Sequence, residues 1–270
     1  MAHRIAQNAC QLSRRVQFQV RVRLWHKQEC TICEVSTCVE GIIPALAGVL
    51  TDESKIRCVL RRQIPMLNEH TTTGRAAVLG AGTMGAQIAA HLANIGWQVL
   101  LLDLTPDHAK QGLERVSKLK PAPFYLPELA SRIEIGGFDS DFPRLKEADW
   151  VIEAVVEKPD IKRELWTRVQ DYVNDRAVLS TNTSGLSIHE MSDDCRDDIK
   201  RRFLGTHFFN PPRYLKLLEI IPRRETDPDI VEGVARFAER VLGKRVVIAR
   251  DTPGFIANRL GIHSMMVVFP

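Results

Sequence analysis

The chain of 270 residues lacks an apolar run long enough to cross a bilayer. The best candidate, residues 42–50, is nine residues long and contains Pro44, whereas a spanning helix needs about 20. Strong net charge is also missing. Residues 1–73 hold ten Lys/Arg and six Asp/Glu, so the remainder holds 27 of each from totals of 37 and 33 and is formally neutral. A neutral body argues against nucleic acid as the main partner.

Cysteine is nearly absent from the body of the chain, where Cys195 is the only one. Such asymmetry does not indicate a disulfide framework for the whole protein. One interpretation of the N-terminal segment is a zinc site, because imidazole and thiolate suit a tetrahedral ion. Its ligands would be His26, Cys30, Cys33 and Cys38. The favoured interpretation is a poorly ordered leader, residues 1–73, with incidental cysteines and no metal, since the segment has no second Cys-x-x-Cys pair and no clear hairpin.

The leader gives a weak indication of where the protein works. Residues 1–28 contain arginine and no acidic residue, which is a feature of mitochondrial presequences. Residues 16–24, however, alternate apolar and polar side chains with the period of a strand, not of a helix. We therefore expect a cytoplasmic protein, with a mitochondrial location as the alternative.

A dinucleotide-binding motif begins at residue 75. The short apolar run 76–79 is typical of a buried parallel strand, and a glycine-rich turn follows it directly. An amphipathic helix over 86–94 and a second apolar strand over 99–102 come next, and the strand ends in Asp103. The turn consists of Gly80, Ala81, Gly82, Thr83, Met84 and Gly85. Because strand, turn, helix, strand and acid occur in this order, the motif predicts a Rossmann nucleotide site.

Each part of this motif has a physical role. Gly80 permits the tight turn, Gly82 lets the backbone approach a pyrophosphate, and Gly85 lets helix and strand pack closely. The helix N-terminus offers N–H groups and a positive dipole end to the phosphates. Asp103 can accept both ribose hydroxyls and would repel a 2′-phosphate, so the expected cofactor is NAD and not NADP.

Strand and helix patterns continue to alternate after Asp103. We expect helices over 106–119 and 159–172 and strands over 133–135, 150–155 and 177–180. This order predicts an α/β fold with a Rossmann-type, doubly wound, mostly parallel sheet. Ligands bind beyond the C-terminal strand ends of such sheets. The polar residues just after predicted strands are Glu157, Asn182, Thr183 and Ser184, for which cofactor contact and turn formation are equally open.

A candidate catalytic pair follows in the last third of the chain. One predicted strand ends in His207, and Glu219 lies within the apolar strand 217–221. A buried carboxylate needs a partner, and a histidine on a neighbouring strand can provide one. Alcohol oxidation by hydride transfer needs a base for the hydroxyl proton, which an imidazole held in one tautomer supplies. The spacing alone leaves open a structural histidine with an exposed, edge-strand glutamate.

From residue 75 to about 266 the chain resembles the NAD-binding part of the L-3-hydroxyacyl-CoA dehydrogenases. It looks closest to the dehydrogenase part of bacterial fusion enzymes that also carry an enoyl-CoA hydratase. The motifs that carry the resemblance, besides the glycine turn, are residues 153–157 (EAVVE), 182–184 (NTS), 207–211 (HFFNP) and 251–259 (DTPGFIANR). It implies NAD-dependent oxidation of (S)-3-hydroxyacyl-CoA to 3-ketoacyl-CoA in fatty-acid β-oxidation.

The resemblance also implies roles for single residues. His207 matches the general base and Glu219 its partner, and Asn258 matches a residue that completes the site. Ser184 and Asn210 match groups that touch substrate oxygen and nicotinamide, and the pair five residues apart, Glu157 and Lys162, matches cofactor contacts. Relatives often have serine where this chain has Gly185, which leaves Ser184 in place. Lys118 and Lys120 are candidates only for the CoA nucleotide.

The expected organisation is a leader over 1–73, the NAD-binding domain over 74–251 and the start of a helical domain over 252–270. In the family the helical domain supplies part of the acyl-CoA cleft and, in stand-alone members, the dimer interface. Its shortness here leads us to expect a truncated or fused reading frame, with a homodimer or a fusion enzyme as possible contexts. Two alternatives remain: an NAD-binding module without full activity, and a hydroxy-acid or sugar-acid dehydrogenase of the same superfamily.

Overall fold

The computed structural model describes residues 19–26, 29–36, 67 and 70–268. The chain divides into two compact units, Met1–Ile64 and Pro65–Pro270, which are described separately. Within the described residues, no helix is both long and apolar enough to cross a membrane.

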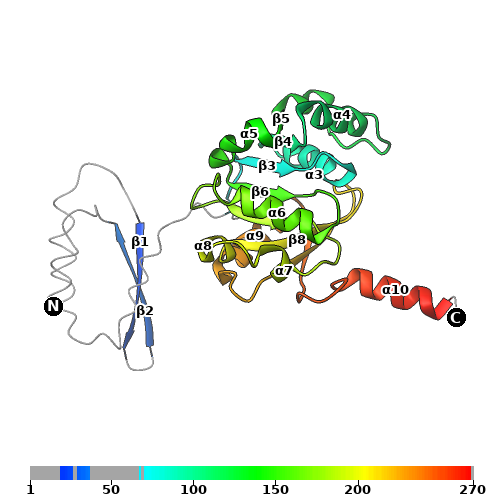
Figure 1. The fold of residues 1–270 in the computed structure, drawn as a ribbon. Helices are drawn as coiled ribbons and strands as arrows, with labels where there is room; N and C mark the ends of the chain where they lie inside the picture. Colours follow the sequence, from blue (N-terminus) through cyan, green and yellow to red (C-terminus); the bar gives the residue numbers. More distant parts are fainter. Residues whose placement is uncertain (1–18, 27–28, 37–66, 68–69, 269–270) are drawn as a thin grey trace. The chain divides into compact units, whose positions relative to one another are not determined.

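The first unit contains an antiparallel hairpin of β1 (Gln19–His26) and β2 (Glu29–Ser36), in which His26 pairs with Glu29 and Gln19 with Ser36 (Figure 1). Residues 19–24 of the period-two pattern therefore form part of a strand, while 16–18 lie outside the described residues, and the expectation of no clear hairpin was wrong. The signal missed was the second strand, ECTICEVS, whose threonine, isoleucine and valine favour extended backbone. Cys38, and the side chains of the other three residues of the zinc hypothesis, lie outside what the structure describes.

The second unit is built on a sheet of eight strands in the order β10-β9-β8-β7-β6-β3-β4-β5. Six strands run parallel, while β9 is antiparallel to β8 and parallel to β10. The strands are β3 (Arg75–Leu79), β4 (Gln98–Asp103), β5 (Ile133–Gly137), β6 (Trp150–Glu153), β7 (Val178–Thr181), β8 (Phe203–Phe208), β9 (Leu217–Pro222) and β10 (Arg245–Ile248). The six parallel strands have the order expected of a Rossmann fold, which confirms the predicted fold class.

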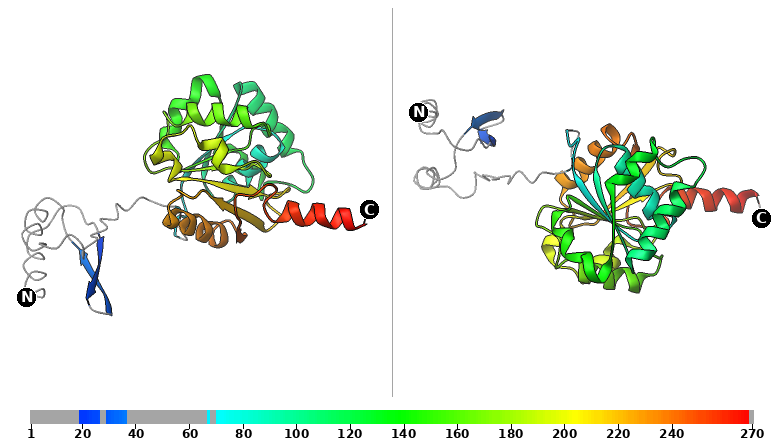
Figure 2. Two further views of the ribbon diagram at one scale, coloured as in Figure 1. Left: turned by 60° about the horizontal axis from the view of Figure 1, so that its bottom comes forward. Right: turned by 90° about the horizontal axis from the view of Figure 1, so that it is seen from above.

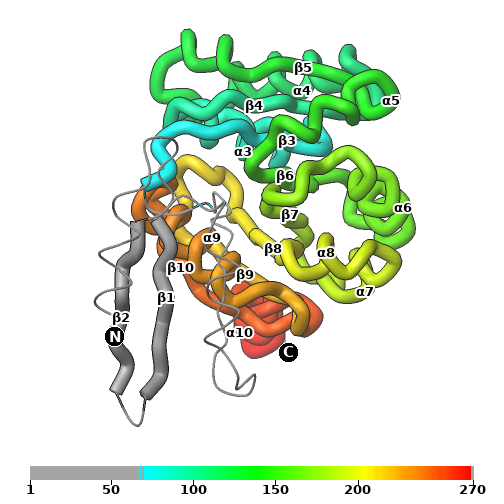
Figure 3. The backbone as a smooth tube through the Cα atoms, turned by 90° about the vertical axis from the view of Figure 1, so that its left-hand side faces the viewer, coloured from blue at the N-terminus to red at the C-terminus, as the bar shows by residue number. Residues whose placement is uncertain are grey.

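Helices cover both faces of this sheet. They are α3 (Thr83–Asn94), α4 (Pro106–Ser117), α5 (Phe138–Asp141), α6 (Pro159–Val169), α7 (Ile188–Ser192), α8 (Asp197–Lys200), α9 (Pro228–Arg240) and α10 (Ala257–Val268), with 3-10 turns η1 (Pro127–Arg132) and η2 (Phe142–Glu147). In Figure 3 α6, α7 and α8 lie across β7 and β8 from α9. Neither α9 nor β10 was predicted from the sequence, although α9 buries Ile230, Val234 and Phe237 at helical spacing.

Side chains of successive strand residues pack into two separate cores. Ala76 and Val78 of β3 face the core that contains α3, α4 and α9, whereas Ala77 and Leu79 face the core beneath α6 and α7. A strand buried on both faces must be apolar at every position, which is why β3 reads as a continuous apolar run. The first core also includes Leu67, whose side chain is 1% exposed.

The last helix, α10, differs from the others because none of its residues is buried. It projects away from the sheet in both views of Figure 2. The apolar side chains of Leu260, Ile262, Met265 and Met266 are each about 60% exposed or more (58–68%). Its first residue, Ala257, nevertheless contacts the sheet, because its N–H group donates a hydrogen bond to Glu219 of β9.

Candidate active site

The glycine turn joins β3 to α3 at the C-terminal edge of the sheet. Gly80 has φ of +102°, and a Cβ there would lie 2.7 Å from the carbonyl oxygen of Ala154. A Cβ on Gly85 would lie 1.9 Å from the carbonyl oxygen of Gly80. Both glycines are therefore required by the fold itself. A Cβ on Gly82, in contrast, would meet nothing within 4 Å.

Asp103 lies beside this turn at the end of β4. One carboxylate oxygen accepts a hydrogen bond from the N–H of Ala81 at 2.7 Å, and the other accepts one from Leu104 at 2.7 Å. The turn and Asp103 border a hollow of about 390 Å³, which Ala154, Val155 and Arg168 also line. An open backbone at Gly82, a helix N-terminus and a carboxylate facing one hollow fit a dinucleotide.

His207 and Glu219 occupy directly paired positions of β8 and β9. The Nδ1 of His207 is 2.7 Å from Oε2 of Glu219, and the two residues are 5% and 1% exposed. This confirms the expectation that the carboxylate is buried against the histidine and excludes an exposed edge-strand glutamate. Because Glu219 accepts from Nδ1–H, the neutral ring carries its lone pair on Nε2.

A third element completes this pair. The other oxygen of Glu219, Oε1, accepts hydrogen bonds from the backbone N–H groups of Ile256 at 3.0 Å and Ala257 at 2.9 Å. These N–H groups lie at the start of α10, where they and the helix dipole favour a negative charge. The His207–Glu219 pair is thus held by residues from both β strands and from the start of α10.

Two aromatic rings pack against the imidazole. The ring centres of Phe209 and Phe255 lie 4.4 and 5.9 Å from that of His207. Phe255 has φ of +48°, a conformation that is unfavourable for a bulky side chain. The ring is 2% exposed, so burial of its apolar surface offsets the backbone strain. The rings keep water from most of the imidazole.

A second cluster lies where β6 and β7 end. The Nζ of Lys162 is 2.5 Å from Oε1 of Glu153 and 3.2 Å from Oε2 of Glu157, and Lys162 is 1% exposed. Oε1 of Glu157 in turn accepts hydrogen bonds from Thr183 Oγ1 and, at 2.7 Å, from the N–H of Ser184. Burial raises the pKa of Glu157, but the hydrogen bond from Thr183 and the charge of Lys162 outweigh it and lower that pKa below its ordinary value.

This cluster fixes the segment that carries Ser184. Asn258 Nδ2 donates to the carbonyl oxygen of Ser184 at 2.7 Å. A Cβ on Gly185 would come within 3.0 Å of the N atom of Gly254, so glycine suits the close approach of these two segments. The structure therefore brings together four of the predicted site residues: Glu157, Lys162, Ser184 and Asn258.

Asn210 follows β8 and is exposed, while its side chain contacts α3. Its Oδ1 accepts a hydrogen bond from Nε2 of Gln87 at 3.0 Å. Neither Gln87 nor Glu153 was predicted as a site residue, although Glu153 is the first residue of the motif 153–157. A polar residue among the apolar positions of α3, and an acid at the end of the apolar strand β6, were the signals available for both.

The two candidate lysines lie apart from these clusters. Lys118 and Lys120 are exposed at the end of α4, and no hydrogen bond or ion pair within the described part of the chain joins them to the other predicted site residues. The segment 122–124, which follows Lys120, is hydrogen-bonded to the loop after Asn210. Arg213 in this loop donates to the carbonyl oxygens of Ala122 at 2.6 Å and Phe124 at 2.7 Å.

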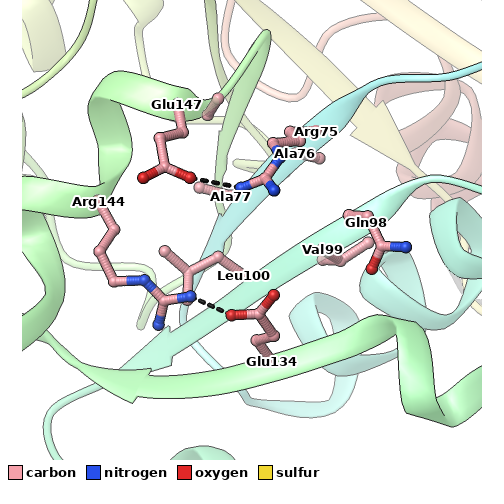
Figure 4. Close-up of a pocket in the computed structure, with 10 residues that line it drawn as sticks. Arg75, Ala76, Ala77, Gln98, Val99, Leu100, Glu134, Arg144 and Glu147 are labelled. Carbon is pink, nitrogen blue, oxygen red and sulfur yellow. Dashed lines mark hydrogen bonds and ion pairs between the residues drawn. The ribbon is translucent and has the colours of Figure 1, made fainter.

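A further hollow lies at the opposite edge of the sheet, around the start of β3 and β4 (Figure 4). It is crossed by the ion pairs Arg75–Glu147 and Arg144–Glu134 and has a volume of only about 20 Å³. That is room for about one water molecule, so this hollow does not compete with the C-terminal edge as a ligand site.

The fold and these clusters define a Rossmann dinucleotide-binding domain that carries a buried histidine–glutamate pair. The family model described as 3-hydroxyacyl-CoA dehydrogenase, NAD binding domain, matches residues 75–252. The chain belongs to this family, which confirms the expected resemblance and the expected cofactor, NAD.

Curated relatives and solved structures agree with this assignment. A probable 3-hydroxyacyl-CoA dehydrogenase of Deinococcus radiodurans is 49% identical over 199 residues, which are 71% of this chain and 58% of that protein. A putative fatty acid oxidation complex trifunctional enzyme of Rickettsia felis is 38% identical, over 72% of this chain and 28% of that protein. The structure of 3-hydroxybutyryl-CoA dehydrogenase from Escherichia coli superposes with a TM-score of 0.63 at 31% identity, covering 70% of this chain and 40% of that one.

Proposed function

We propose that the protein acts in the NAD-dependent oxidation of (S)-3-hydroxyacyl-CoA thioesters to 3-ketoacyl-CoA in fatty-acid β-oxidation. The observation that carries this proposal is the buried His207–Glu219 pair, which lies at the end of β8, at the edge of the sheet where the glycine turn also lies. The names of the relatives support the substrate class. Because the chain spans about 58% of the first of these relatives, the activity of the whole protein is part of the proposal.

His207 acts as the general base in this proposal. Its Nε2 takes the proton of the C3 hydroxyl as the carbon–oxygen double bond forms. Glu219 holds the ring through Nδ1–H and stabilises the imidazolium that results, and the N–H groups of Ile256 and Ala257 keep the carboxylate in place. Phe209 and Phe255 exclude water from the pair.

NAD, when bound, supplies the acceptor for the hydride that leaves C3. The turn from Gly80 to Gly85 would hold its pyrophosphate, and Asp103 would hold the adenosine ribose. Glu157 and Lys162 serve the cofactor side of the site as well. Because the ammonium of Lys162 is buried between Glu153 and Glu157, it acts by holding Glu157 and, through it, the N–H of Ser184.

The polar residues around the pair orient the substrate. Ser184 and Asn210 are exposed at the ends of β7 and β8, and they present side chains suited to a substrate oxygen or a carboxamide. Asn258 completes this side by binding the backbone of Ser184. Lys118 and Lys120 remain candidates for the CoA nucleotide.

The partners that we propose are an acyl-CoA substrate and either a second copy of the chain or a fused enzyme of the same pathway. The trifunctional relative in Rickettsia supports the fusion context. Neither nucleic acid nor a membrane is proposed as a partner. A cytoplasmic location is supported by the bacterial relatives alone.

The decisive experiment follows NADH when the protein is given NAD and (S)-3-hydroxybutyryl-CoA, and NADH loss when it is given acetoacetyl-CoA. A free hydroxy acid and a sugar acid serve as competing substrates, and His207→Gln is the control for background activity. Thioester-dependent turnover that disappears in the control supports the proposal.

Two other results would replace it. Normal NAD binding without turnover on any substrate would indicate a cofactor-binding module, which a version extended by a relative's helical domain would test further. Turnover on the free acids that exceeds turnover on the thioester would indicate a hydroxy-acid dehydrogenase of the same superfamily.

A further inference from the structure

Gln87 lies in the second turn of α3, directly after the glycine turn, and is 5% exposed. Its buried neighbours on the helix are small or apolar apart from His91, and they include Ala86, Ile88 and Ala90. A buried amide among such residues is costly unless it is hydrogen-bonded. Gln87 meets this requirement through two acceptors that lie on different elements.

Both hydrogens of the Gln87 amide nitrogen are engaged. Nε2 donates to the carbonyl oxygen of Thr83 at 2.9 Å and to Oδ1 of Asn210 at 3.0 Å. The carbonyl oxygen of Thr83 can only accept, so a rotated Gln87 amide would place its own oxygen against another oxygen. The backbone of α3 therefore sets the orientation of Gln87.

Gln87 then determines the orientation of Asn210. The Gln87 nitrogen offers hydrogens, so Asn210 must turn its oxygen toward α3 and its Nδ2 away from α3. Asn210 is exposed and follows the end of β8, where the proposed substrate and nicotinamide lie. We propose that Gln87 is a positioning residue, which makes Asn210 present an N–H donor, not an acceptor, to the reacting ligands.

This inference rests on the proposed function for the identity of the ligands, but the orientation of Asn210 is a property of the protein alone. A donor from Asn210 suits a carbonyl or hydroxyl oxygen of the substrate or the carboxamide oxygen of nicotinamide. The hydrogen bond also ties the helix that starts at the nucleotide turn to the loop that follows His207. The Gln87 side chain thereby connects the helix of the proposed cofactor site with the loop of the proposed substrate site.

Two substitutions separate orientation from packing. In Gln87→Glu the ionised carboxylate only accepts, so Asn210 should rotate, donate to the new carboxylate through Nδ2 and turn its oxygen to the site. In Gln87→Met a side chain of similar length makes no hydrogen bond, so both orientations of Asn210 become accessible. We expect kcat/KM to fall about 3–10-fold in Gln87→Met and about 100-fold in Gln87→Glu.

The orientation is measured independently of activity by the side-chain amide signal of Asn210 in a ¹⁵N NMR spectrum, identified by its loss in Asn210→Asp. In Gln87→Glu this amide gains a charged acceptor, and its proton signal should move downfield. In Gln87→Met the Oδ1 of Asn210 loses its donor, so the amide signal should shift and average over the two orientations, without the downfield move expected in Gln87→Glu. Gln98→Glu, which changes an exposed glutamine at the start of β4 and the other edge of the sheet, is the matched control and should change neither signal nor rate.

A pH profile gives a third readout that a purely structural role would not affect. Protonation of the carboxylate introduced by Gln87→Glu restores a donor toward Asn210. The ratio of kcat/KM in this variant to that in the natural chain should therefore rise as the pH falls. Should Gln87→Glu fail to fold, as judged by its thermal melt, the Gln87→Met measurements decide.

The possible results separate the two proposals. An unchanged Asn210 signal in the folded variants, or equal rates in Gln87→Met and Gln87→Glu with the signal moved, overturns the positioning role. If the natural chain shows no turnover on hydroxyacyl-CoA, the proposed function fails, and the NMR result by itself still decides whether Gln87 orients Asn210.

Discussion

The nucleotide side and the proton-transfer side of this domain are assembled in different ways. The nucleotide side uses backbone geometry within one continuous stretch, from β3 through the glycine turn and α3 to Asp103. The proton-transfer side uses side chains and N–H groups from three segments, around residues 207, 219 and 256. Substitutions on the nucleotide side should therefore change mainly the affinity for the cofactor, and substitutions on the proton-transfer side should change mainly the turnover rate.

The largest expected effect comes from His207→Gln. The variant removes the proposed base, so turnover should fall about 10²–10⁴-fold, while NAD affinity should stay nearly unchanged because the nucleotide elements are untouched. Glu219→Gln keeps the shape and loses the charge, so it should slow turnover by less. Stopped-flow kinetics and calorimetric titration of NAD provide the two measurements. Unaltered turnover in His207→Gln would show that the pair is structural.

Shortening the chain from its N-terminus should show where the domain begins. Removal of residues 1–64 is expected to leave NAD affinity and the melting temperature nearly unchanged, because the compact unit starts at Pro65. Removal of 1–73 also deletes Leu67, which is 1% exposed and belongs to the first core, the one that contains α3, α4 and α9. This deletion should lower the free energy of unfolding by about 2–5 kcal/mol. Thermal melts of both versions and of Leu67→Ala provide the comparison. Loss of folding on removal of 1–64 would instead assign the hairpin a structural role.

Two glycines of the same turn should behave differently. Gly80→Ala combines a positive φ with a contact of 2.7 Å to Ala154, so it should lower the melting temperature and NAD affinity together. Gly82→Ala meets nothing within 4 Å, so it should leave the melting temperature unchanged and weaken NAD binding alone. Parallel melts and titrations distinguish the two. A Gly82→Ala protein that binds NAD normally would mean that the pyrophosphate does not approach at this residue.

Asp103 should control the choice between NAD and NADP. The natural chain should bind NAD more tightly than NADP. In Asp103→Ala the ratio of the two dissociation constants should fall about tenfold, because the carboxylate that repels the 2′-phosphate is removed. Titration with both cofactors tests this. Equal affinities in the natural chain would contradict the assignment. Asp103 also accepts from the N–H of Ala81, so the melting temperature should be recorded for each variant.

The smallest expected effect concerns His91 on the buried face of α3. Burial and the charge of Lys244 lower the pKa of His91 from 6.5 to about 3, although the backbone of Leu242 acts in the opposite direction. Below pH 6.5 this histidine is protonated in the unfolded chain, whereas in the folded chain it stays neutral down to about pH 3. The free energy of unfolding is therefore unaffected by this group above pH 6.5 and falls as the pH is lowered from 6.5 to about 3. His91→Leu should raise stability by about 1–3 kcal/mol and reduce this loss. Denaturant unfolding at pH 7 and pH 5 measures it, and an unchanged pH dependence would contradict it.

The two regions also differ in how far they could be predicted. The glycine turn, α3 and Asp103 follow one another within about 30 residues (75–103), and their function depends on glycine conformation and strand order, which the sequence displays. Pairing of His207 with Glu219 could be suggested from spacing, because neighbouring strands are often consecutive. The hairpin β1–β2, the helix α9 and the edge strand β10 were missed, since their patterns carried no motif.

The sequence by itself determined the Rossmann class, the turn, the acid at the end of β4 and the candidate base, because these depend on local periodicity and residue chemistry. Only the tertiary structure decided that Glu219 is held by the first N–H groups of α10, that Lys162 lies buried between Glu153 and Glu157, and that Gln87 bonds to Asn210. These contacts join residues up to 123 positions apart. Their geometry depends on how the strands and helices pack, and no local pattern encodes which distant donor reaches which acceptor.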